Sequence, residues 1–226
     1  MNKAVVLLSG GLDSATTLYY ARQKGFNCHC LIFDYGQRHK KEIRSAKKIA
    51  DLARCEWQVV KINLPWRGSA LLDKKLDIQT RRGLNIQTPA DNAIPSTYVP
   101  ARNIIFLSFA LSCAEAIGAK AIFIGANAID YSGYPDCRPG FFKAFVKAAD
   151  SGTRTGVENK PIKILTPLIN KTKSEIIKSG IKLGVPYRFT WSCYKGGNAP
   201  CGKCDSCRFR QKGFREAGLK DPIWSN

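Results

Sequence analysis

Residues 4–14 read AVVLLSGGLDS and give the clearest indication of the fold in this chain. A run of apolar residues ends in a Ser-Gly-Gly turn, and a helical pattern follows over residues 14–23, with Gly25 just past its end. An unbroken apolar strand, rather than an alternating one, is typical of a parallel sheet that is buried on both faces. The stretch therefore predicts the first strand, turn and helix of an α/β domain.

Outward from this stretch, short apolar runs alternate with helical patterns. Further strands are expected at residues 28–33, 57–62, 121–125 and 162–165. Helices are expected at residues 38–54, 103–117, 140–149 and, as the last helix, from Thr172, which stands at capping-box spacing from Glu175. This alternation predicts an α/β fold whose parallel sheet has about five strands and helices on both faces. Residues 63–100 are rich in proline, and we expect them to form an insertion that acts as a lid.

Composition excludes several classes of protein. Apolar residues make up 44% of the 226 residues and charged residues 23%, which excludes disordered, collagen-like and coiled-coil chains. The longest apolar stretch, residues 104–114, is too short to cross a bilayer, and the N-terminus lacks the pattern of an export signal. We therefore expect a cytoplasmic protein without a membrane partner, whose nine cysteines are thiols or metal ligands.

The formal net charge is +19, from 36 Lys and Arg residues against 17 Asp and Glu residues. Such a charge permits nucleic-acid binding, but basic proteins also bind nucleotides and other small anions. The densest basic run, residues 38–54, has apolar positions at helical spacing, so its basic side chains are expected to form a solvated helix face. We expect no nucleic-acid partner.

The Ser-Gly-Gly turn is a candidate phosphate-binding loop. Its glycines let backbone amides turn inward around an anion, and the helix that follows adds unpaired amides and the positive end of its dipole. Ser9 and Ser14 can donate hydroxyl hydrogen bonds. The Asp13 carboxylate would repel phosphate unless it holds a cation, which makes it a candidate magnesium ligand. The loop has neither the lysine of a Walker A motif nor the spacing of a dinucleotide fingerprint, and a simple tight turn is the alternative interpretation.

Four cysteines near the C-terminus predict a metal site. Cys193, Cys201, Cys204 and Cys207 have seven, two and two residues between neighbours. Four thiolates close a tetrahedral shell, the pattern of structural zinc. An iron–sulfur cluster is the second interpretation, although a ferredoxin sequence would continue with a further Cys and then Pro. Four thiols without a metal are the third interpretation. The change of pattern at Tyr187 predicts a main domain at residues 1–186 and a zinc module at residues 187–226.

Polar and aromatic residues gather after the strand expected at residues 121–125. Rings can stack on a flat heterocycle, a carboxylate can accept two N–H bonds from a guanine-type edge, and arginine can bind a carboxylate through two hydrogen bonds. A turn that is merely rich in Gly and Pro is the alternative. The candidate substrate-binding residues are Asn127, Asp130, Tyr131, Asp136 and Arg138.

Three further side chains stand where a strand or helix would present them to the same edge of the sheet. Arg102 precedes the helix expected at residues 103–117 and is positioned to meet phosphate. Lys173, in the first turn of the last helix, either meets phosphate or is solvated. His39 is expected to be a surface or capping residue rather than a catalytic group.

The other cysteines of strand and helix patterns, at positions 28, 30, 55 and 113, are expected to be buried structural thiols.

Residues 9–14 resemble the pyrophosphate loop of the N-type ATP pyrophosphatases, which adenylate a substrate oxygen and release pyrophosphate. Residues 34–39, the pair Arg102–Asn103, residues 125–138 and the Trp-Ser-Cys that leads to the four cysteines extend the similarity. Together these segments resemble the QueC family of the queuosine pathway, in the order of that family and over nearly the whole chain. Ala101 departs from the pattern, since many relatives have glycine before the Arg-Asn pair.

The resemblance implies an adenine nucleotide alpha hydrolase-like fold and an ATP-dependent conversion of 7-carboxy-7-deazaguanine and ammonia to the 7-cyano compound. The carboxylate would be adenylated and attacked by ammonia, and the amide would be adenylated in turn to leave a nitrile. It also implies a homodimer, magnesium, structural zinc, and catalytic roles for Asp13, Arg102 and Lys173. The residues expected to bind ATP are Leu8, Ser9, Gly10, Gly11, Leu12, Asp13, Ser14, Ala15, Thr16, Thr17 and Leu18.

Two rival functions stay open at this point. A tRNA-thiolating or lysidine-type ATP pyrophosphatase would use the same loop on another substrate, and the net charge would suit tRNA. A non-catalytic, zinc-containing nucleic-acid-binding module would use the cysteines alone.

Overall fold

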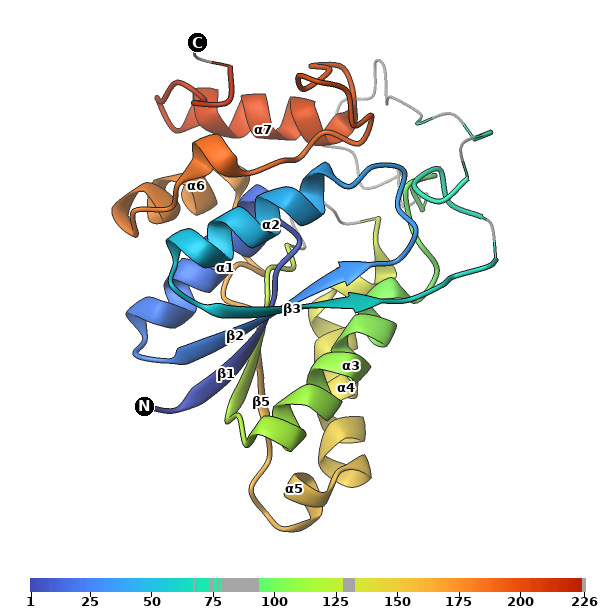
Figure 1. Ribbon diagram of the computed structural model, residues 1–226, viewed down its shortest axis with the longest axis vertical. Helices are drawn as coiled ribbons and strands as arrows, with labels where there is room; N and C mark the ends of the chain where they lie inside the picture. Colours follow the sequence, from blue (N-terminus) through green and yellow to red (C-terminus); the bar gives the residue numbers. More distant parts are fainter. Residues whose placement is uncertain (67, 74, 77, 79–93, 128–132, 225–226) are drawn as a thin grey trace.

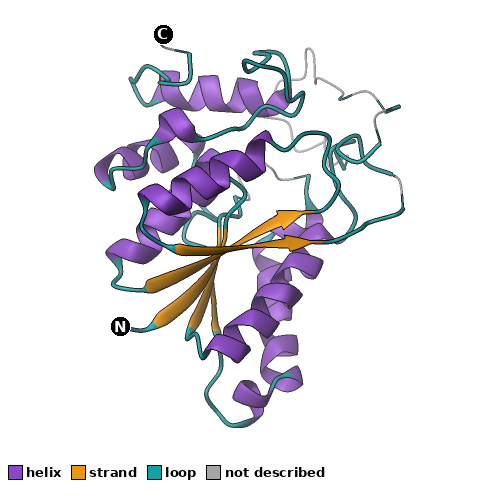
Figure 2. Cartoon of the chain, viewed as in Figure 1, coloured by secondary structure: helices purple, strands orange, loops and turns teal. Residues whose placement is uncertain are grey.

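A five-stranded parallel sheet forms the centre of the protein (Figures 1 and 2). The computed structural model describes residues 1–66, 68–73, 75–76, 78, 94–127 and 133–224. The strands are β1 (Lys3–Leu7), β2 (Asn27–Asp34), β3 (Glu56–Lys61), β4 (Ala121–Ile124) and β5 (Lys163–Leu165). Their order is β3-β2-β1-β4-β5, and every neighbouring pair is parallel. The predicted α/β class, with its parallel sheet and flanking helices, is confirmed.

Helices cover both faces of the sheet (Figure 1). One face carries α1 (Leu12–Gln23), α2 (Lys41–Leu52), α6 (Lys173–Lys182) and α7 (Asp205–Glu216). The other carries α3 (Arg102–Ile117) and α4 (Pro139–Gly152), with the short α5 (Arg154–Val157) after α4. The sequence of β1 is continuously apolar because the strand is buried on both faces: Val5 packs into one core and Val6 into the other, and both are fully buried.

The C-terminal part differs from the expectation that the helix beginning near Thr172 is the last one. That helix, α6, does begin with the predicted capping box between Thr172 and Glu175. A further helix, α7, follows it and packs along it. Its Phe214 lies with Tyr187 in the core formed by α1, α2 and β1, whereas the four cysteines form a separate small cluster with Trp191. The division at residue 187 therefore stays a prediction, and the two parts share a core.

The site is expected at the carboxyl ends of the strands. From β1 the chain first adds β2 and β3 on one side of β1, and it later adds β4 and β5 on the other side. In open parallel sheets, this change of direction opens a crevice where ligands bind. The Ser-Gly-Gly loop lies directly at this point.

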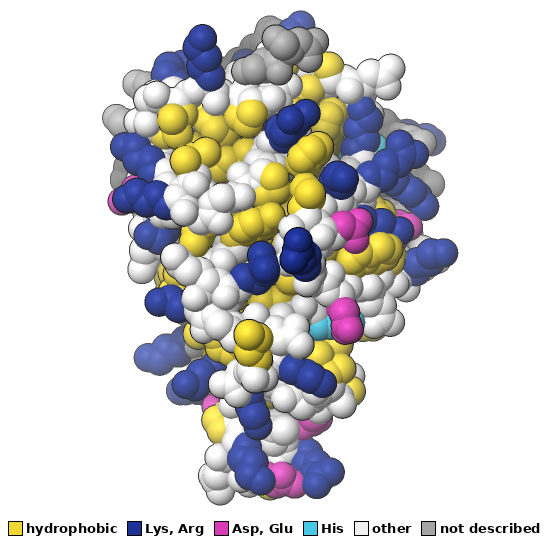
Figure 3. Space-filling view, turned by 60° about the vertical axis from the view of Figure 1, so that its left-hand side comes forward, with side chains coloured by type: hydrophobic (Ala, Val, Ile, Leu, Met, Phe, Trp, Pro, Cys, Tyr) yellow, Lys and Arg dark blue, Asp and Glu magenta, His cyan; other side chains and the backbone are white. Residues whose placement is uncertain are grey.

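Basic side chains do not form one continuous patch on the face shown in Figure 3. On the face shown in Figure 3, Lys and Arg side chains lie scattered among apolar and polar ones instead of forming one stripe. Among the described residues, no helix is long and apolar enough to cross a membrane.

Ala101 precedes α3 in a left-handed conformation, with φ of 55°. This conformation costs alanine about 1–2 kcal/mol of strain, which glycine does not have. Glycine loses more conformational entropy than alanine on folding, and this loss offsets only part of the relieved strain. Ala101→Gly should therefore raise the free energy of unfolding by about 0.5–1 kcal/mol in a urea titration. The matched control is Ala116→Gly on the exposed side of α3, which should lower the free energy of unfolding by about 1 kcal/mol. A loss of stability in both variants would contradict strain at Ala101.

Candidate active site

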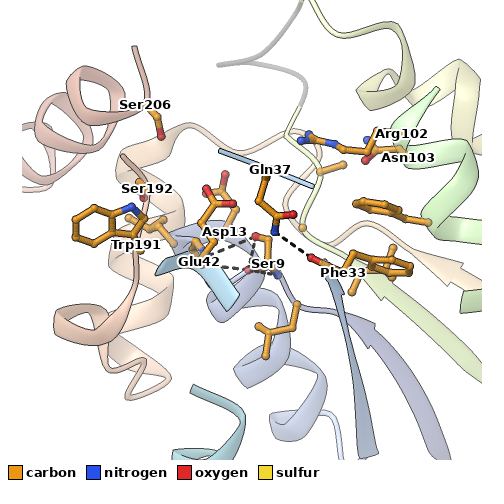
Figure 4. A pocket seen from close by; sticks show the side chains of 18 of the residues that line it. Ser9, Asp13, Phe33, Gln37, Glu42, Arg102, Asn103, Trp191, Ser192 and Ser206 are labelled. Atoms are coloured by element: carbon orange, nitrogen blue, oxygen red, sulfur yellow. Dashed lines mark hydrogen bonds between the residues drawn. The ribbon is translucent and has the colours of Figure 1, made fainter. Parts of the chain in front are cut away.

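A cavity of about 260 Å³ opens at the carboxyl ends of β1, β2 and β4. Figure 4 shows its labelled side chains: Ser9 and Asp13 lie at the floor, Arg102 on one side and Trp191 on the other. The floor comes from the loop after β1, one wall from the start of α3, and the opposite wall from the segment before the four cysteines. Three stretches that are distant in the sequence thus meet at one site.

The loop after β1 is built to leave amides free for an anion. The hydroxyl oxygens of Ser9 and Ser14 lie 3.0 Å apart, and Ser14 donates to the carbonyl of Gly11 at 3.1 Å. Gly11 is the N-cap of α1 and has no side chain to cap the helix. The amides of the first turn of α1 therefore point toward the cavity, with the positive end of the helix dipole behind them.

Two glycines allow the loop to lie close to its neighbours. Gly10 has φ of 82°, and a Cβ atom there would lie 2.3 Å from the backbone oxygen of Glu42. A Cβ at Gly125, at the end of β4, would lie 3.0 Å from the backbone of Asp13 and Ser14. The loop is thus held between α2 and β4, and substitution at Gly10 would disturb it even though Gly10 does not line the cavity.

Asp13 and Lys173 form the main charged pair of the site. Lys173 Nζ lies 2.8 Å from both carboxylate oxygens of Asp13, and only 7% of the lysine side chain is exposed. The pair joins the first turn of α1 to the first turn of α6. Gly213 of α7 leaves room for it, because a Cβ there would lie 2.4 Å from Lys173 Cγ. The ammonium group supplies a cation that compensates the Asp13 carboxylate beside the Ser-Gly-Gly loop.

Glu42 is a cavity residue that the sequence did not single out. It stands in the first turn of α2, and its side chain points toward Asp13 and Ser9 in Figure 4. Burial raises the pKa of the Glu42 carboxyl to about 7, although Arg102 opposes the shift. Near neutral pH this carboxyl therefore exists in both its protonated and ionised forms.

The raised pKa of Glu42 makes the folded state less stable as pH increases. The unfolded chain ionises this group near its ordinary pKa of 4.5 and the folded protein only near 7, so stability falls between these values. Glu42→Gln should remove this loss, narrowing the difference in unfolding free energy between pH 5 and pH 8 by about 2 kcal/mol in urea titrations. The control is Glu216→Gln, at a side chain of α7 that is 46% exposed and pairs with a lysine. Equal pH dependence in wild type and Glu42→Gln would contradict the assignment.

Aromatic side chains form the wall beside Arg102. The rings of Phe33 and Phe106 stack with centroids 4.0 Å apart, and Tyr35 packs edge-on against Phe106. Arg102 donates to the Tyr35 hydroxyl at 3.3 Å. Gln37 holds the end of β2 in place, since it accepts from the Tyr35 amide and donates to the Phe33 carbonyl. This wall is therefore aromatic, with one guanidinium at its edge.

The opposite wall comes from the C-terminal part of the chain. The Trp191 amide donates to the Gly10 carbonyl at 2.9 Å, which ties this segment to the Ser-Gly-Gly loop. Ser192 and Ser206 also line the cavity. His39 lies edge-on to Trp191 at the cavity margin, and burial lowers the pKa of its imidazole. His39 is therefore a neutral ring at neutral pH.

The four predicted metal ligands meet in space. The sulfur atoms of Cys193, Cys201, Cys204 and Cys207 all lie within 4.8 Å of one another. In a tetrahedral zinc site with Zn–S bonds of about 2.3 Å, sulfur atoms lie about 3.8 Å apart, so the donor set fits a single ion. Backbone amides of Cys201, Lys203 and Cys204 donate to cysteine sulfurs at 3.4 Å, as thiolates require. The cluster has no open position, which is the arrangement of a structural metal.

The structure separates the predicted nucleotide- and substrate-binding residues into three groups. Those that line the cavity are Leu8, Ser9, Gly11, Leu12, Asp13, Ser14, Arg102, Asn127 and Lys173. Those that do not line it are Gly10, Ala15, Thr16, Thr17, Leu18, Asp136 and Arg138. Asp130 and Tyr131 lie outside the described residues.

Two of the predicted substrate residues lie at the starts of α3 and α4. The Asp136 carboxylate accepts the amide of Asn103 at 3.0 Å, and Asn103 Nδ2 donates to the Asp136 carbonyl at 2.9 Å. Asp136 therefore holds the start of α3, next to Arg102. Arg138 is exposed and is the N-cap of α4. Asn127 faces the cavity and also binds the carbonyl of Lys171, which fixes β4 to the start of α6.

Comparison with known proteins assigns a family. The chain matches the family described as Queuosine biosynthesis protein QueC over residues 3–218. It is 53% identical to a 7-cyano-7-deazaguanine synthase of Nostoc punctiforme, over 98% of both chains, and 53% identical to one of Acetivibrio thermocellus, over 99% of this chain and 97% of that one. The solved structure of NMN synthetase from Francisella tularensis has a TM-score of 0.50 at 15% identity, covering 97% of this chain and 78% of that one, which shows a shared fold. The chain therefore belongs to the QueC family of queuosine biosynthesis proteins and is an enzyme of the ATP-dependent ligase type.

Proposed function

We propose that this enzyme converts 7-carboxy-7-deazaguanine, ammonia and ATP to 7-cyano-7-deazaguanine, AMP and pyrophosphate. The observation that carries the proposal is the buried Asp13–Lys173 pair beside a loop with free helix amides, at the switch point of a parallel sheet. The names of the similar synthases give the substrate class. One cavity would perform the same activation twice.

The chemistry explains why a site of this kind is needed. A carboxylate oxygen attacks the α-phosphorus of ATP and displaces pyrophosphate, giving an acyl adenylate. Ammonia then displaces AMP and gives an amide. The amide oxygen attacks the α-phosphorus of a second ATP and displaces a second pyrophosphate, and loss of both N–H protons and of AMP leaves the nitrile. Both substrate oxygens leave with AMP, so the site must mainly position ATP and stabilise charge on phosphate.

The residues on the floor of the cavity supply that stabilisation. The amides at the start of α1 and the hydroxyls of Ser9 and Ser14 would hold the phosphates. Lys173 and Arg102 would offset the charge that develops on them. The Asp13 carboxylate has lone pairs beyond those that Lys173 uses, and it would hold magnesium, which supplies further charge neutralisation.

The deazaguanine would lie beside the aromatic wall of the cavity. The aromatic rings of Phe106 and Tyr35 line the cavity and would contact a planar heterocycle, and Asn127 lines the same cavity. Asp136 would act as a positioning residue through α3. We propose structural zinc at the four cysteines, a C-terminal module from residue 187, a cytoplasmic location and a homodimer. Ile104 and Phe109 of α3, exposed at 44% and 43%, are apolar side chains that a second copy would cover, and sedimentation measures that assembly.

The proposal is tested with purified, zinc-replete protein, ATP, magnesium, ammonium and 7-carboxy-7-deazaguanine, with products measured by mass spectrometry. Two AMP and two pyrophosphate should appear for each nitrile. AMP release without nitrile would mean that the enzyme adenylates an acceptor other than 7-carboxy-7-deazaguanine. Complete absence of AMP from folded protein would contradict adenylation altogether.

A further inference from the structure

Three cysteines meet at the end of the sheet opposite the cavity. Cys28 and Cys30 belong to β2, and Cys55 immediately precedes β3. The parallel register pairs His29 with Glu56, so Cys55 stands one step earlier, beside Cys28. Cys28 and Cys30 face the same core and are 3% and 0% exposed, whereas Cys55 is half-buried at the margin of that core. The sequence alone indicated separate structural thiols at these positions.

The three sulfur atoms interact with one another. In their protonated forms the Cys28 thiol donates to the Phe26 carbonyl at 3.6 Å and the Cys55 thiol donates to the Ala53 carbonyl at 3.4 Å. Interaction with Cys28 and Cys30 lowers the pKa of Cys55, and the same interaction, together with burial, raises the pKa of Cys28 and of Cys30. From α1, Arg22 and Tyr19 also lie near Cys55, and the positive charge of Arg22 favours its thiolate. Cys55, the half-buried member of the group, is therefore the one of the three that ionises most readily, and it has two buried thiols beside it.

This arrangement has a defined reactivity. A thiolate, rather than a thiol, attacks peroxides, and sites that sense oxidants combine an accessible thiolate with a second thiol that resolves the first product. Isolated buried cysteines lack both features.

We propose that Cys55 is a hydroperoxide-reactive site and that Cys28 resolves it to a disulfide. The Cys55 thiolate attacks one oxygen of a hydroperoxide, the O–O bond breaks, and Cys55 becomes a sulfenic acid while an alcohol or water leaves. The Cys28 sulfur then attacks the Cys55 sulfur, the S–O bond breaks, and water leaves with the thiol proton. Two thiols are oxidised to one disulfide, and one hydroperoxide is reduced.

The sheet geometry selects Cys28 over Cys30 as the partner. Neighbouring strands lie about 4.8 Å apart, within the range of Cα separations that a disulfide spans. Cys30 stands two residues further along β2, which places its Cα about 8 Å from that of Cys55 on the diagonal, beyond the reach of a disulfide without backbone movement. The bond would join two strands that already pair, so we expect the fold and the cavity to survive oxidation.

The test uses full-length, metal-loaded protein treated with hydrogen peroxide and digested with trypsin without reduction. Cleavage after Lys24, Arg38, Arg54 and Lys61 places Cys28 and Cys30 in residues 25–38 and Cys55 in residues 55–61. Mass spectrometry should find these two peptides joined, with a loss of two hydrogens. The joined peptide should persist in Cys30→Ser and disappear in Cys28→Ser and Cys55→Ser.

A chelator dye that reports released metal separates this reaction from oxidation of the four-cysteine cluster. Iodoacetamide labelling gives an independent readout: the rate at Cys55 should stay nearly constant from pH 6 to pH 8. The matched control is Cys113, another half-buried cysteine whose pKa is raised by burial, and its rate should rise about tenfold per pH unit. Absence of the joined peptide at peroxide levels that retain the metal would overturn the proposal. Persistence of the joined peptide in Cys28→Ser would overturn the assignment of the partner.

Discussion

Asp13→Asn should lower the rate of ATP-dependent turnover by about 10²–10³-fold, the usual effect of removing one charge-stabilising group from an active site. The substitution removes the charge that holds Lys173 Nζ, which lies 2.8 Å from both oxygens of Asp13. It also removes the proposed magnesium ligand next to the phosphate-binding loop. The side chain keeps its shape, so the fold should be retained.

The measurement is AMP release at saturating ammonium, with ATP varied, in Asp13→Asn, Lys173→Met and the double variant. Because the two residues act as one unit, the double variant should lose much less than the product of the single losses. Glu158→Gln is the control, since Glu158 also pairs with a basic residue, Arg154 at 2.7 Å, but on the surface. Activity of Asp13→Asn within about twofold of wild type would contradict the proposed position of ATP.

Cys204→Ser should remove the metal and unfold the segment that carries the four cysteines. Cys204 is fully buried in the four-sulfur cluster. Structural zinc sites contribute about 10–16 kcal/mol of apparent binding free energy, comparable to the whole stability of a domain. Catalysis should be lost as well, because Trp191 and Ser192 form a wall of the cavity and Trp191 holds the Gly10 carbonyl.

Elemental analysis should find one zinc per chain in wild type and less than a tenth of that in Cys204→Ser. Limited proteolysis should cut the variant within residues 191–207 much faster than it cuts the wild type. Cys113→Ser, which lies on α3 outside the cluster, should keep both the metal and the resistance. Iron with sulfide in the wild-type protein, or full activity without any metal, would contradict a structural zinc.

The elements that the sequence predicted are those set by local patterns. The loop at residues 9–14 combines an apolar strand, glycines and a helix start within a few residues, so its conformation follows from nearby chemistry. The capping box at Thr172 and Glu175 is local in the same way. By contrast, the helix α7 was missed, because the glycines and cysteines before it dominate the pattern and its apolar residue Phe214 finds its partners in distant segments.

The arrangement of the candidate site depends on contacts between distant segments, which local patterns do not predict. The order of strands cannot be read from periodicity, and it is this order that brings the start of α6 to the loop after β1 and pairs Lys173 with Asp13. Glu42 belongs to a basic, amphipathic helix, and nothing in its neighbours indicates that its carboxyl faces a cavity. Asp136 has the chemistry of a substrate ligand, but the tertiary structure uses its carboxylate to hold the start of α3.

The most direct test of adenylation at both steps follows the substrate oxygens. The enzyme is given 7-carboxy-7-deazaguanine with both carboxylate oxygens replaced by ¹⁸O, together with ATP, magnesium and ammonium. If the carboxylate and then the amide are each adenylated, mass spectrometry should find one ¹⁸O in every AMP and none in pyrophosphate. Label in inorganic phosphate, with ADP as the nucleotide product, would show phosphoryl transfer instead and would contradict the account.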